Sequence, residues 1–155
     1  MSDPTPLFRR LTMDEKALAA EMFGASLDSE RVRILAAPLW RRAFVAGPGL
    51  MVWPAATVRP DFAALEVPLR EQGVFVHELT HVWQAQQGVS LILAKLKAGD
   101  GPKAYAYDLD SAAFADMNIE QQAMVVEHAF LTSRGAAAPH GAGRYASLSA
   151  AWRRG

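Results

Sequence analysis

The sequence predicts an α+β domain, because strand-like and helix-like patterns both occur along its 155 residues. Short strand-like runs occupy 31–35, 43–46 and 50–53. Two long helical segments follow, at 68–87 and 118–134. A chain of this length is typical of one domain that buries a core of its own.

The strand predictions rest on alternation and on turn residues. Val32 lies between two arginines and is followed by Ile34, which is the alternation of a half-buried strand. The next two runs flank Gly47-Pro48-Gly49, a turn signal between strands. We therefore expect two strands joined by this turn, followed by an irregular stretch that contains prolines.

Capping boxes indicate where two helices begin. Thr12 and Glu15 form one box, and Asn118 and Gln121 form the other. The second of these helices is expected to end at Gly135. Its apolar stripe consists of Ile119, Ala123, Val126 and Phe130.

The helix expected at 68–87 has apolar residues on all its sides, which is typical of a helix at the centre of a protein. Pro68 suits its first position. A shorter helix is expected at 90–97. The segment 103–109 carries two tyrosines in alternation, so we expect a strand or a loop there.

The central helix contains His77-Glu78-Leu79-Thr80-His81. The four-residue spacing places both imidazoles on one helix face, as two ligands of a tetrahedral zinc ion require. Glu78 lies at the edge of this face, so it can act as general base on a zinc-activated water without being a ligand. The alternative is a core helix with two hydrogen-bonded histidines, but a lone carboxylate among uncharged neighbours is costly there. We therefore expect His77 and His81 to bind zinc.

A hydrolytic zinc site needs a third protein ligand and one open position. Glu120 is our first choice, because it lies in the first turn of a capped helix beside the apolar stripe. Glu127, two turns further on, is the second choice. The helix dipole alone also favours acidic residues in a first turn, so Glu120 has a purely structural alternative. The remaining candidates are Asp108, Asp110, Asp116, His128 and His140.

Three further side chains are candidates for supporting roles. Tyr105 or Tyr107 could donate a hydrogen bond to the oxyanion of a tetrahedral intermediate, and simple packing is the alternative for each. His128 follows Glu127 directly, so it lies one residue off the helix face that Glu120 and Glu127 share. It is therefore either a residue that contacts a ligand without binding the metal or a surface histidine.

Composition excludes several classes of protein. With 16 basic and 16 acidic residues, the chain has no general attraction to nucleic acid or to anionic lipid. Because cysteine is absent, zinc can be held only by histidine and carboxylate. No apolar run approaches the ~20 residues of a membrane span, and no secretory signal is visible. We therefore expect a cytoplasmic protein, with export by a machine that reads no N-terminal signal as the alternative.

The segment from Gly135 to Gly143 is rich in alanine and glycine, which is typical of a flexible linker. We therefore expect a single domain at 1–134. The remainder, 135–155, is expected to be flexible, with a short helix within 144–152.

The two main motifs resemble those of the zincin metallopeptidases. The resemblance rests on VHELTHVWQ, from Val76 to Gln84, and on NIEQQA, from Asn118 to Ala123. The chain is also similar, over most of residues 11–131, to small bacterial proteins known as Vgr-related. These take their name from the spike proteins of contractile secretion systems.

The zincin resemblance implies a small fold in which a twisted sheet lies over the metal helix and its edge strand helps bind an extended peptide. It implies that His77 and His81 are zinc ligands, that Glu78 is the general base, and that Glu120 is a ligand of the gluzincin type. The chain lacks the Asn-Glu-x-x-x-Asp motif of better-known gluzincins. It also lacks the longer His-Glu-x-x-His-x-x-Gly-x-x-His pattern of metzincins.

The expected function is that of a zinc-dependent metallopeptidase acting on a peptide or protein substrate. The alternative is a zinc-stabilised, non-catalytic accessory or assembly module of a contractile secretion system, with a protein of that system as its partner. The presence of Glu78 favours the peptidase, because a structural zinc site needs no base.

Overall fold

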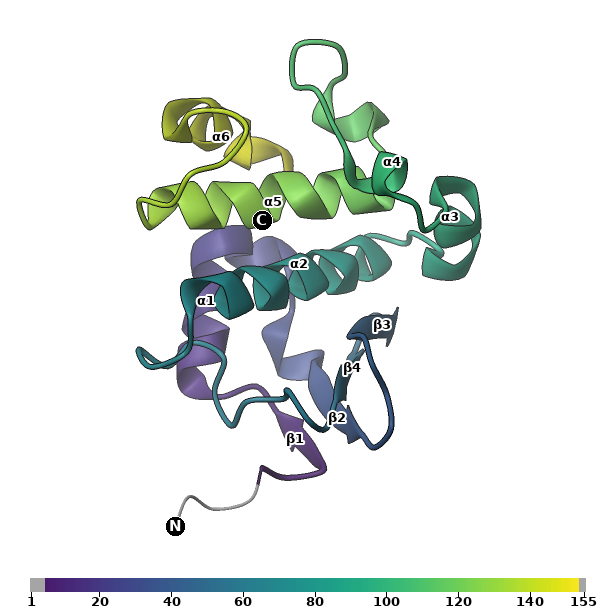
Figure 1. Cartoon of the computed structure of the whole chain (residues 1–155), viewed down its shortest axis with the longest axis vertical. Helices are drawn as coiled ribbons and strands as arrows, with labels where there is room; N and C mark the ends of the chain where they lie inside the picture. Colours follow the sequence, from purple (N-terminus) through teal and green to yellow (C-terminus); the bar gives the residue numbers. More distant parts are fainter. Residues whose placement is uncertain (1–4, 154–155) are drawn as a thin grey trace.

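Two long helices, α2 (Leu69–Gln86) and α5 (Ile119–Ser133), lie side by side between a small sheet and helix α6 (Ala142–Leu148) (Figure 1). The computed structural model describes residues 5–153. Within this range the chain forms four strands and six α-helices, joined by loops and short 3₁₀ turns. The strands are β1 Phe8–Arg10, β2 Arg33–Ala37, β3 Phe44–Gly47 and β4 Leu50–Pro54, and the other helices are α1 Met13–Phe23, α3 Leu91–Ala98 and α4 Pro102–Tyr105.

The sheet is mixed, with the strand order β1-β2-β4-β3. β1 pairs antiparallel with β2, β2 pairs parallel with β4, and β3 pairs antiparallel with β4. β3 therefore lies at one edge of the sheet, and it contacts α2. The pairing of β3 with β4 shifts register between Val45 and Gly47.

The structure confirms the α+β class, and the strands predicted on either side of Gly47-Pro48-Gly49 are β3 and β4. The strand predicted at 31–35 is β2, which begins two residues later. Its start is displaced because Ser29–Arg31 forms a 3₁₀ turn that the Asp28 side chain caps. The sequence did not predict β1, whose three residues are too few to show a pattern.

Both predicted capping boxes are present. Thr12 Oγ1 accepts a hydrogen bond from Glu15 N at 3.0 Å, and Asn118 Oδ1 accepts one from Gln121 N at 2.8 Å. In each box the glutamate or glutamine side chain also accepts from the backbone N–H of the capping residue. Pro68 is the N-cap residue of α2 and not its first helical residue, so the predicted start was one residue early.

The short helix predicted at 90–97 is α3. The prediction of a strand or loop for 103–109 was wrong at its start, where Pro102–Tyr105 forms α4. Pro102 occupies the first turn of this helix, a position that its fixed φ angle favours. α3 has no buried residue. Within residues 5–153 no helix combines the length and apolar character needed to cross a membrane.

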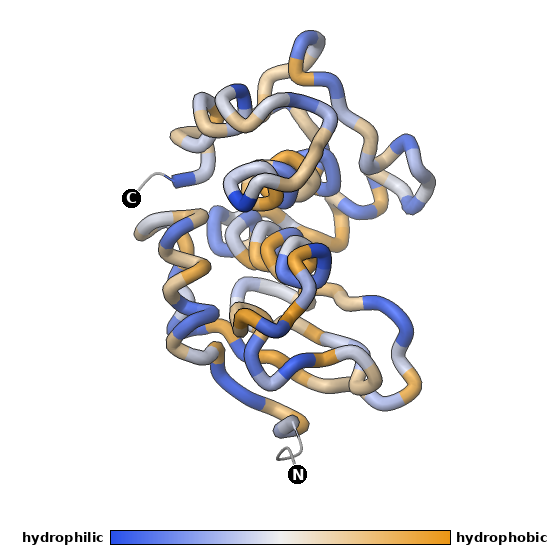
Figure 2. Tube along the Cα trace, turned by 60° about the vertical axis from the view of Figure 1, so that its left-hand side comes forward, coloured by the Kyte–Doolittle hydropathy of each residue, from blue (hydrophilic) through white to orange (hydrophobic). Residues whose placement is uncertain are grey.

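Helix α2 lies at the centre of the apolar core, as its sequence predicts. Phe75, Val76, Leu79 and Val82 are fully buried, at 0% exposure. Val74 is different, since it is 37% exposed and lines a cleft. Figure 2 shows hydrophobic residues, in orange, concentrated on the helices and strands of the interior, whereas hydrophilic residues dominate the outer loops.

Gly73 allows α2 and α5 to approach each other closely. A Cβ atom at this position would lie 3.1 Å from Leu131 Cδ2 and 3.4 Å from Glu127 Cγ. A larger residue at position 73 would therefore push against α5. Because Gly73 lies about one helical turn before His77, this contact helps to set the distance between the two helices near the predicted ligands.

The segment after α5 packs back onto the core. α6 begins at Ala142, two residues before the predicted start, and Tyr145 and Trp152 are each only 1% exposed. The Ser26 hydroxyl donates a hydrogen bond to the Trp152 carbonyl at 2.6 Å, which ties this segment to the N-terminal half. Tyr145 and Trp152 therefore belong to the hydrophobic core. The predicted domain boundary after residue 134 stays a prediction.

A buried carboxylate joins α1 to β1 and to the loop that precedes α2. Glu15 is fully buried. Its oxygens accept two hydrogen bonds from the Arg9 guanidinium, both at 2.8 Å, one from Thr12 N at 2.9 Å and one from Phe62 N at 2.8 Å. Glu15 is therefore both a capping residue, as predicted, and the partner of a largely buried arginine, which the sequence did not indicate.

Replacing Glu15 by alanine should lower the free energy of unfolding by about 3–5 kcal/mol, because the Arg9 charge is left buried without its partner. Glu21→Ala is the matched control on the same helix. Glu21 pairs with Arg134 at the surface, and the loss of an exposed ion pair costs about 0–1 kcal/mol. Urea denaturation measures both variants, and equal losses would contradict the role given to Glu15.

Candidate metal centre

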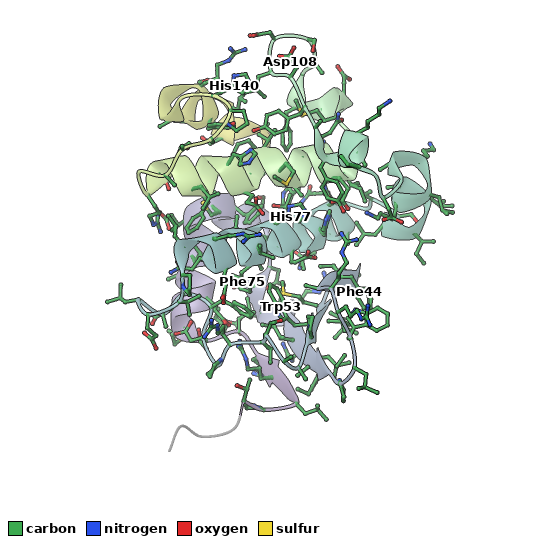
Figure 3. All side chains as sticks on the ribbon, in the orientation of Figure 1. Phe44, Trp53, Phe75, His77, Asp108 and His140 are labelled. Atoms are coloured by element: carbon green, nitrogen blue, oxygen red, sulfur yellow. The ribbon has the colours of Figure 1, made fainter. Side chains whose placement is uncertain are left out.

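Helices α2 and α5 bring together the side chains of His77, His81 and Glu120. One ligand atom of each lies within 4.8 Å of the other two. Glu120 Oε2 is 3.2 Å from His77 Nε2, and Glu120 Oε1 is 3.4 Å from His81 Nε2. The two imidazole rings are 5.0 Å apart and nearly perpendicular. Figure 3 shows His77 between the two helices.

Local sequence explains this arrangement. The four-residue spacing of His77 and His81 puts them on one face of α2. The capping box of Asn118 fixes where α5 begins, and Glu120 therefore lies in its first turn. Ala123, one turn further on, is fully buried, and Glu120 is buried beside it. The carboxylate is thus turned inward, toward α2, and not toward solvent.

Burial and mutual contact shift the pKa values of the three groups differently. Burial lowers the pKa of His77. Burial also acts to lower the pKa of His81, but the hydrogen bond to Glu120 and the negative charges of Glu78 and Glu120 outweigh it and raise this pKa. Burial acts to raise the pKa of Glu120, but its hydrogen bonds to both histidines outweigh it and hold that pKa well below the usual range. Glu120 is therefore a carboxylate at neutral pH.

The three groups could together hold a metal ion. Two imidazole nitrogens and one carboxylate oxygen are the ligand set of catalytic zinc sites that keep a fourth position open. The sequence contains no cysteine, so no thiolate competes for the ion. The residues present therefore fit zinc, and the identity of the metal is part of the proposal below.

Glu78 lies beside these three groups, and all four side chains line one cleft. Its side chain is buried, and its Oε2 atom has no hydrogen-bond partner among the described residues. Burial raises the pKa of this carboxyl to about 7. A buried carboxyl without a partner costs folding free energy.

Gln84 holds His81 in one orientation and links it to α5. Its Nε2 donates to the Ile119 carbonyl and to Gln122 Oε1, both at 3.0 Å, which fixes the direction of the amide. Gln84 Oε1 then accepts a hydrogen bond from His81 Nδ1 at 2.8 Å. A metal at this site would take the lone pair of His81 Nε2 in place of the contact with Glu120, and Gln84 Oε1 would then hold the remaining proton on Nδ1.

Two further charges contact the predicted ligands. Glu127, the second choice as third ligand, places Oε1 3.6 Å from His77 Nδ1, at the ring nitrogen opposite the one that faces Glu120. Burial raises the pKa of Glu127 to about 7. Lys95 of α3 places Nζ 3.2 Å from Glu120 Oε1. Glu127 and Lys95 both line the cleft; Glu127 contacts the far nitrogen of His77, and Lys95 contacts Glu120.

A cleft of about 1220 Å³ opens onto His77, Glu78 and His81. The loop before β3 and β3 itself line one side of it, where Figure 3 places Phe44, and α3 lines another. Tyr105 also lines this cleft, and its ring centre is 6.3 Å from that of His77. Of the predicted supporting residues, Tyr105 is therefore the one that the fold brings to the site.

Tyr107 and His128 lie elsewhere. The Tyr107 hydroxyl hydrogen-bonds to His128 Nδ1 and to the Tyr145 hydroxyl of α6, and neither Tyr107 nor His128 lines the cleft. A direct role in chemistry for these two residues stays a prediction. His140 packs near the same tyrosines, with ring centres 6.2 Å and 6.1 Å away.

Three residues that contact the site were not predicted from the sequence as part of it. Gln84 follows His81 by three residues, a spacing at which helix side chains meet, so this pair could have been found. Lys95 reaches Glu120 from α3, and Arg42 reaches Tyr105 from the loop before β3. Their positions depend on tertiary packing, and no local pattern marks them.

No family model matches this chain. It is 34% identical over 134 residues to the type VI secretion system spike protein VgrG2b of Pseudomonas aeruginosa. This alignment covers 79% of the chain but only 13% of the spike protein. The solved structure of the effector domain of Pseudomonas aeruginosa VgrG2b is 31% identical, with a TM-score of 0.69 over 98% of this chain and 86% of that one. The chain belongs to the family of the VgrG2b effector domain.

Membership of this effector-domain family confirms the Vgr-related part of the resemblance drawn from the sequence. The match extends over nearly the whole of this chain, and therefore includes both helices that carry the site. The chain spans about one eighth of the length of the spike protein. The names of these relatives mention no peptidase.

Gln84→Ala should weaken zinc binding by about 10–100-fold, because His81 loses the partner that fixes its tautomer and orientation. Gln84→Glu keeps an acceptor for His81 Nδ1 and should retain most of the affinity. Gln86→Ala is the control on the same helix, since Gln86 bonds to the Asp28 and Pro48 carbonyls away from the site. Competition with a zinc-chelating dye measures all three, and equal affinities for Gln84→Ala and Gln86→Ala would refute the link.

Glu120→Gln should weaken zinc binding by more than about 100-fold. Removing a ligand lowers the metal affinity more than removing a residue that only hydrogen-bonds to a ligand. Glu127→Gln is an isosteric comparison on the same helix, and it should lose less, about 10-fold, since Glu127 contacts only the far nitrogen of His77. The same dye competition applies. A larger loss for Glu127→Gln than for Glu120→Gln would reverse the order of the two carboxylates as ligands.

Proposed function

We propose that this chain is an effector module associated with a bacterial type VI secretion system, and that its chemistry is zinc-dependent hydrolysis of peptide bonds. The two parts of this proposal have different support. Kinship with the VgrG2b effector domain supports the association with secretion. The arrangement of charged groups in the cleft supports the chemistry.

The position of Glu78 is the observation that carries the peptidase proposal. Its carboxyl is buried next to His77 and His81, lines the cleft, and has an oxygen without a partner. A site that only braces the fold needs ligands but no further acid or base. A pKa near 7 is suited to a group that takes up and releases a proton at neutral pH.

His77, His81 and Glu120 would hold the zinc ion. When bound, zinc supplies a Lewis acid that polarises a carbonyl and lowers the pKa of a water molecule. Glu78 accepts the proton of the attacking water and passes it to the leaving amine. The Tyr105 hydroxyl, which accepts hydrogen bonds from Arg42 and Lys95, would donate a hydrogen bond to the developing oxyanion.

The edge strand β3 suits the binding of an extended peptide. It lies at the end of the sheet order, and Phe44 and Val45 of this strand line the cleft. A peptide that pairs with β3 gains backbone hydrogen bonds. Its scissile carbonyl then lies over the residues of α2 that line the cleft.

The second candidate is a zinc-stabilised module of the secretion system that performs no chemistry. The comparisons favour the secretion-system link more directly than they favour a peptidase. In this case His77, His81 and Glu120 would brace α2 against α5, and Glu78 would have no role as a base.

Substitutions at Glu78 and His81 distinguish the two candidates. Glu78→Gln should keep zinc but lower the rate of peptide cleavage by about 10²–10⁴-fold, because the general base is lost. His81→Ala should lose both zinc and cleavage. Glu71→Gln is the control on α2, since Glu71 pairs with Arg59 outside the cleft. Metal content is measured by elemental analysis, and cleavage with a broad peptide library.

A wild-type protein that holds zinc yet cuts no peptide in the library would favour the non-catalytic module. A protein that binds no metal after zinc is supplied would contradict both candidates. Equal cleavage by Glu78→Gln and Glu71→Gln would remove Glu78 from the mechanism.

A further inference from the structure

We propose that the cleft binds a carboxylate of its substrate between Arg42 and Lys95, so that the preferred substrates are peptides with an acidic group close to the bond that is cut. This inference rests on the proposed peptidase function and deepens it by naming a substrate class. It is supported by the side chains of Arg42 and Lys95, which both donate a hydrogen bond to the Tyr105 hydroxyl beside the predicted ligands.

The convergence involves three separate elements of the fold. Arg42 Nη2 donates to the Tyr105 hydroxyl oxygen at 3.1 Å, and Lys95 Nζ donates to the same oxygen at 3.3 Å. Arg42 comes from the loop between β2 and β3, Lys95 from α3, and Tyr105 from the end of α4. All three residues line the cleft.

The carboxylates of Asp100 and Glu120 act on the Arg42 guanidinium only at a distance. No carboxylate of residues 5–153 forms an ion pair with its guanidinium. The side chain is exposed to the cleft and uses one of its five N–H donors on Tyr105. Two like charges at one neutral hydroxyl repel each other. An anion placed between them would remove this repulsion.

The charge of Lys95 is balanced only in part. Its partner Asp100 lies at 3.1 Å but is 77% exposed, so that this ion pair contributes little. Its other partner is Glu120, a predicted zinc ligand. A bound cation would share the charge of the Glu120 carboxylate and weaken its attraction to Lys95. With metal present, Lys95 could exchange its contact with Glu120, or with the exposed Asp100, for an anion of the substrate.

The position favours a carboxylate that belongs to a peptide. Lys95 Nζ is 3.2 Å from Oε1 of Glu120, a predicted ligand. An anion bound by Lys95 would therefore lie within one side-chain length of a peptide carbonyl held at the metal site. A guanidinium binds a planar carboxylate through two parallel hydrogen bonds. Apolar side chains line the same cleft and can bury the rest of a peptide. They include Trp40, Phe44, Ile92 and Leu96.

The test measures binding to the zinc-loaded Glu78→Gln protein, so that cleavage does not interfere. Three heptapeptides of otherwise neutral residues are compared by titration calorimetry. The first has a central glutamate and blocked ends, the second has glutamine in its place, and the third has glutamine and a free C-terminal carboxylate. We expect a peptide with a carboxylate to bind at least about 10-fold more tightly than the blocked glutamine peptide.

Arg42→Ala, added to the same protein, should abolish this preference, so that the acidic peptides bind no more tightly than the blocked glutamine peptide. Lys97→Ala is the charge-matched control, because Lys97 lies on α3 but does not line the cleft. This control should retain the preference. Zinc content is measured for each variant, so that a lost preference is not mistaken for a lost metal.

Each outcome bears on the proposal. Preference for the glutamate peptide assigns the carboxylate to a side chain, and preference for the free end assigns it to a chain terminus, and both support the site. Equal binding of the three peptides, or an unchanged preference in Arg42→Ala, would overturn it. If Glu78→Gln binds the acidic peptides but the wild type cuts none of them, the peptidase proposal fails while the carboxylate site stands.

Discussion

The packing of α2 against α5 is the contact on which the rest of the structure depends, because it places two imidazoles and a carboxylate within a mostly apolar core. His77 and His81 come from one helix, and Glu120 comes from the other. Glu120 attracts both imidazoles, but for His77 this attraction does not outweigh the cost of burial. Gly73 allows the helices to approach, and the cap at Asn118 determines which residue of α5 faces α2. Stability and ligand spacing are therefore properties of the same interface.

The remaining elements act on this interface from its two sides. The sheet supports α2 from below in Figure 1 and brings its edge strand β3 alongside the cleft. α3 and α4, on the other side, carry Lys95 and Tyr105 to the predicted ligands. This chain thus places its charged groups where short, separate segments meet. One long helix pair places the predicted ligands, and the segments around it supply the other polar groups of the cleft.

The sequence predicted most of what depends on local patterns. The four-residue spacing of His77 and His81, the cap at Asn118 and the turn at Gly47-Pro48-Gly49 each involve neighbours along the chain, and each determines a structure within a few residues. These features place each of the three residues on the helix face where it is found, and the packing of α2 on α5 brings the two faces together.

Features that depend on distant segments were not predicted. Arg9 and Phe62 reach Glu15 from other parts of the chain, and Arg42 and Lys95 reach Tyr105 in the same way. The sequence around a charged residue does not show whether its side chain is in solvent or contacts a site formed by distant segments. The start of α4 was missed for a different reason, since four residues are too few to show a helical period.

The register shift between Val45 and Gly47 gives the edge of the sheet a particular character. A regular edge strand offers an unbroken row of backbone groups, and such rows recruit other chains of any sequence, including copies of the same protein. Here the row is short and irregular, so a partner chain can align over only a few residues. The edge thereby remains open to a brief segment of polypeptide while resisting the indefinite stacking of strands that leads to fibres.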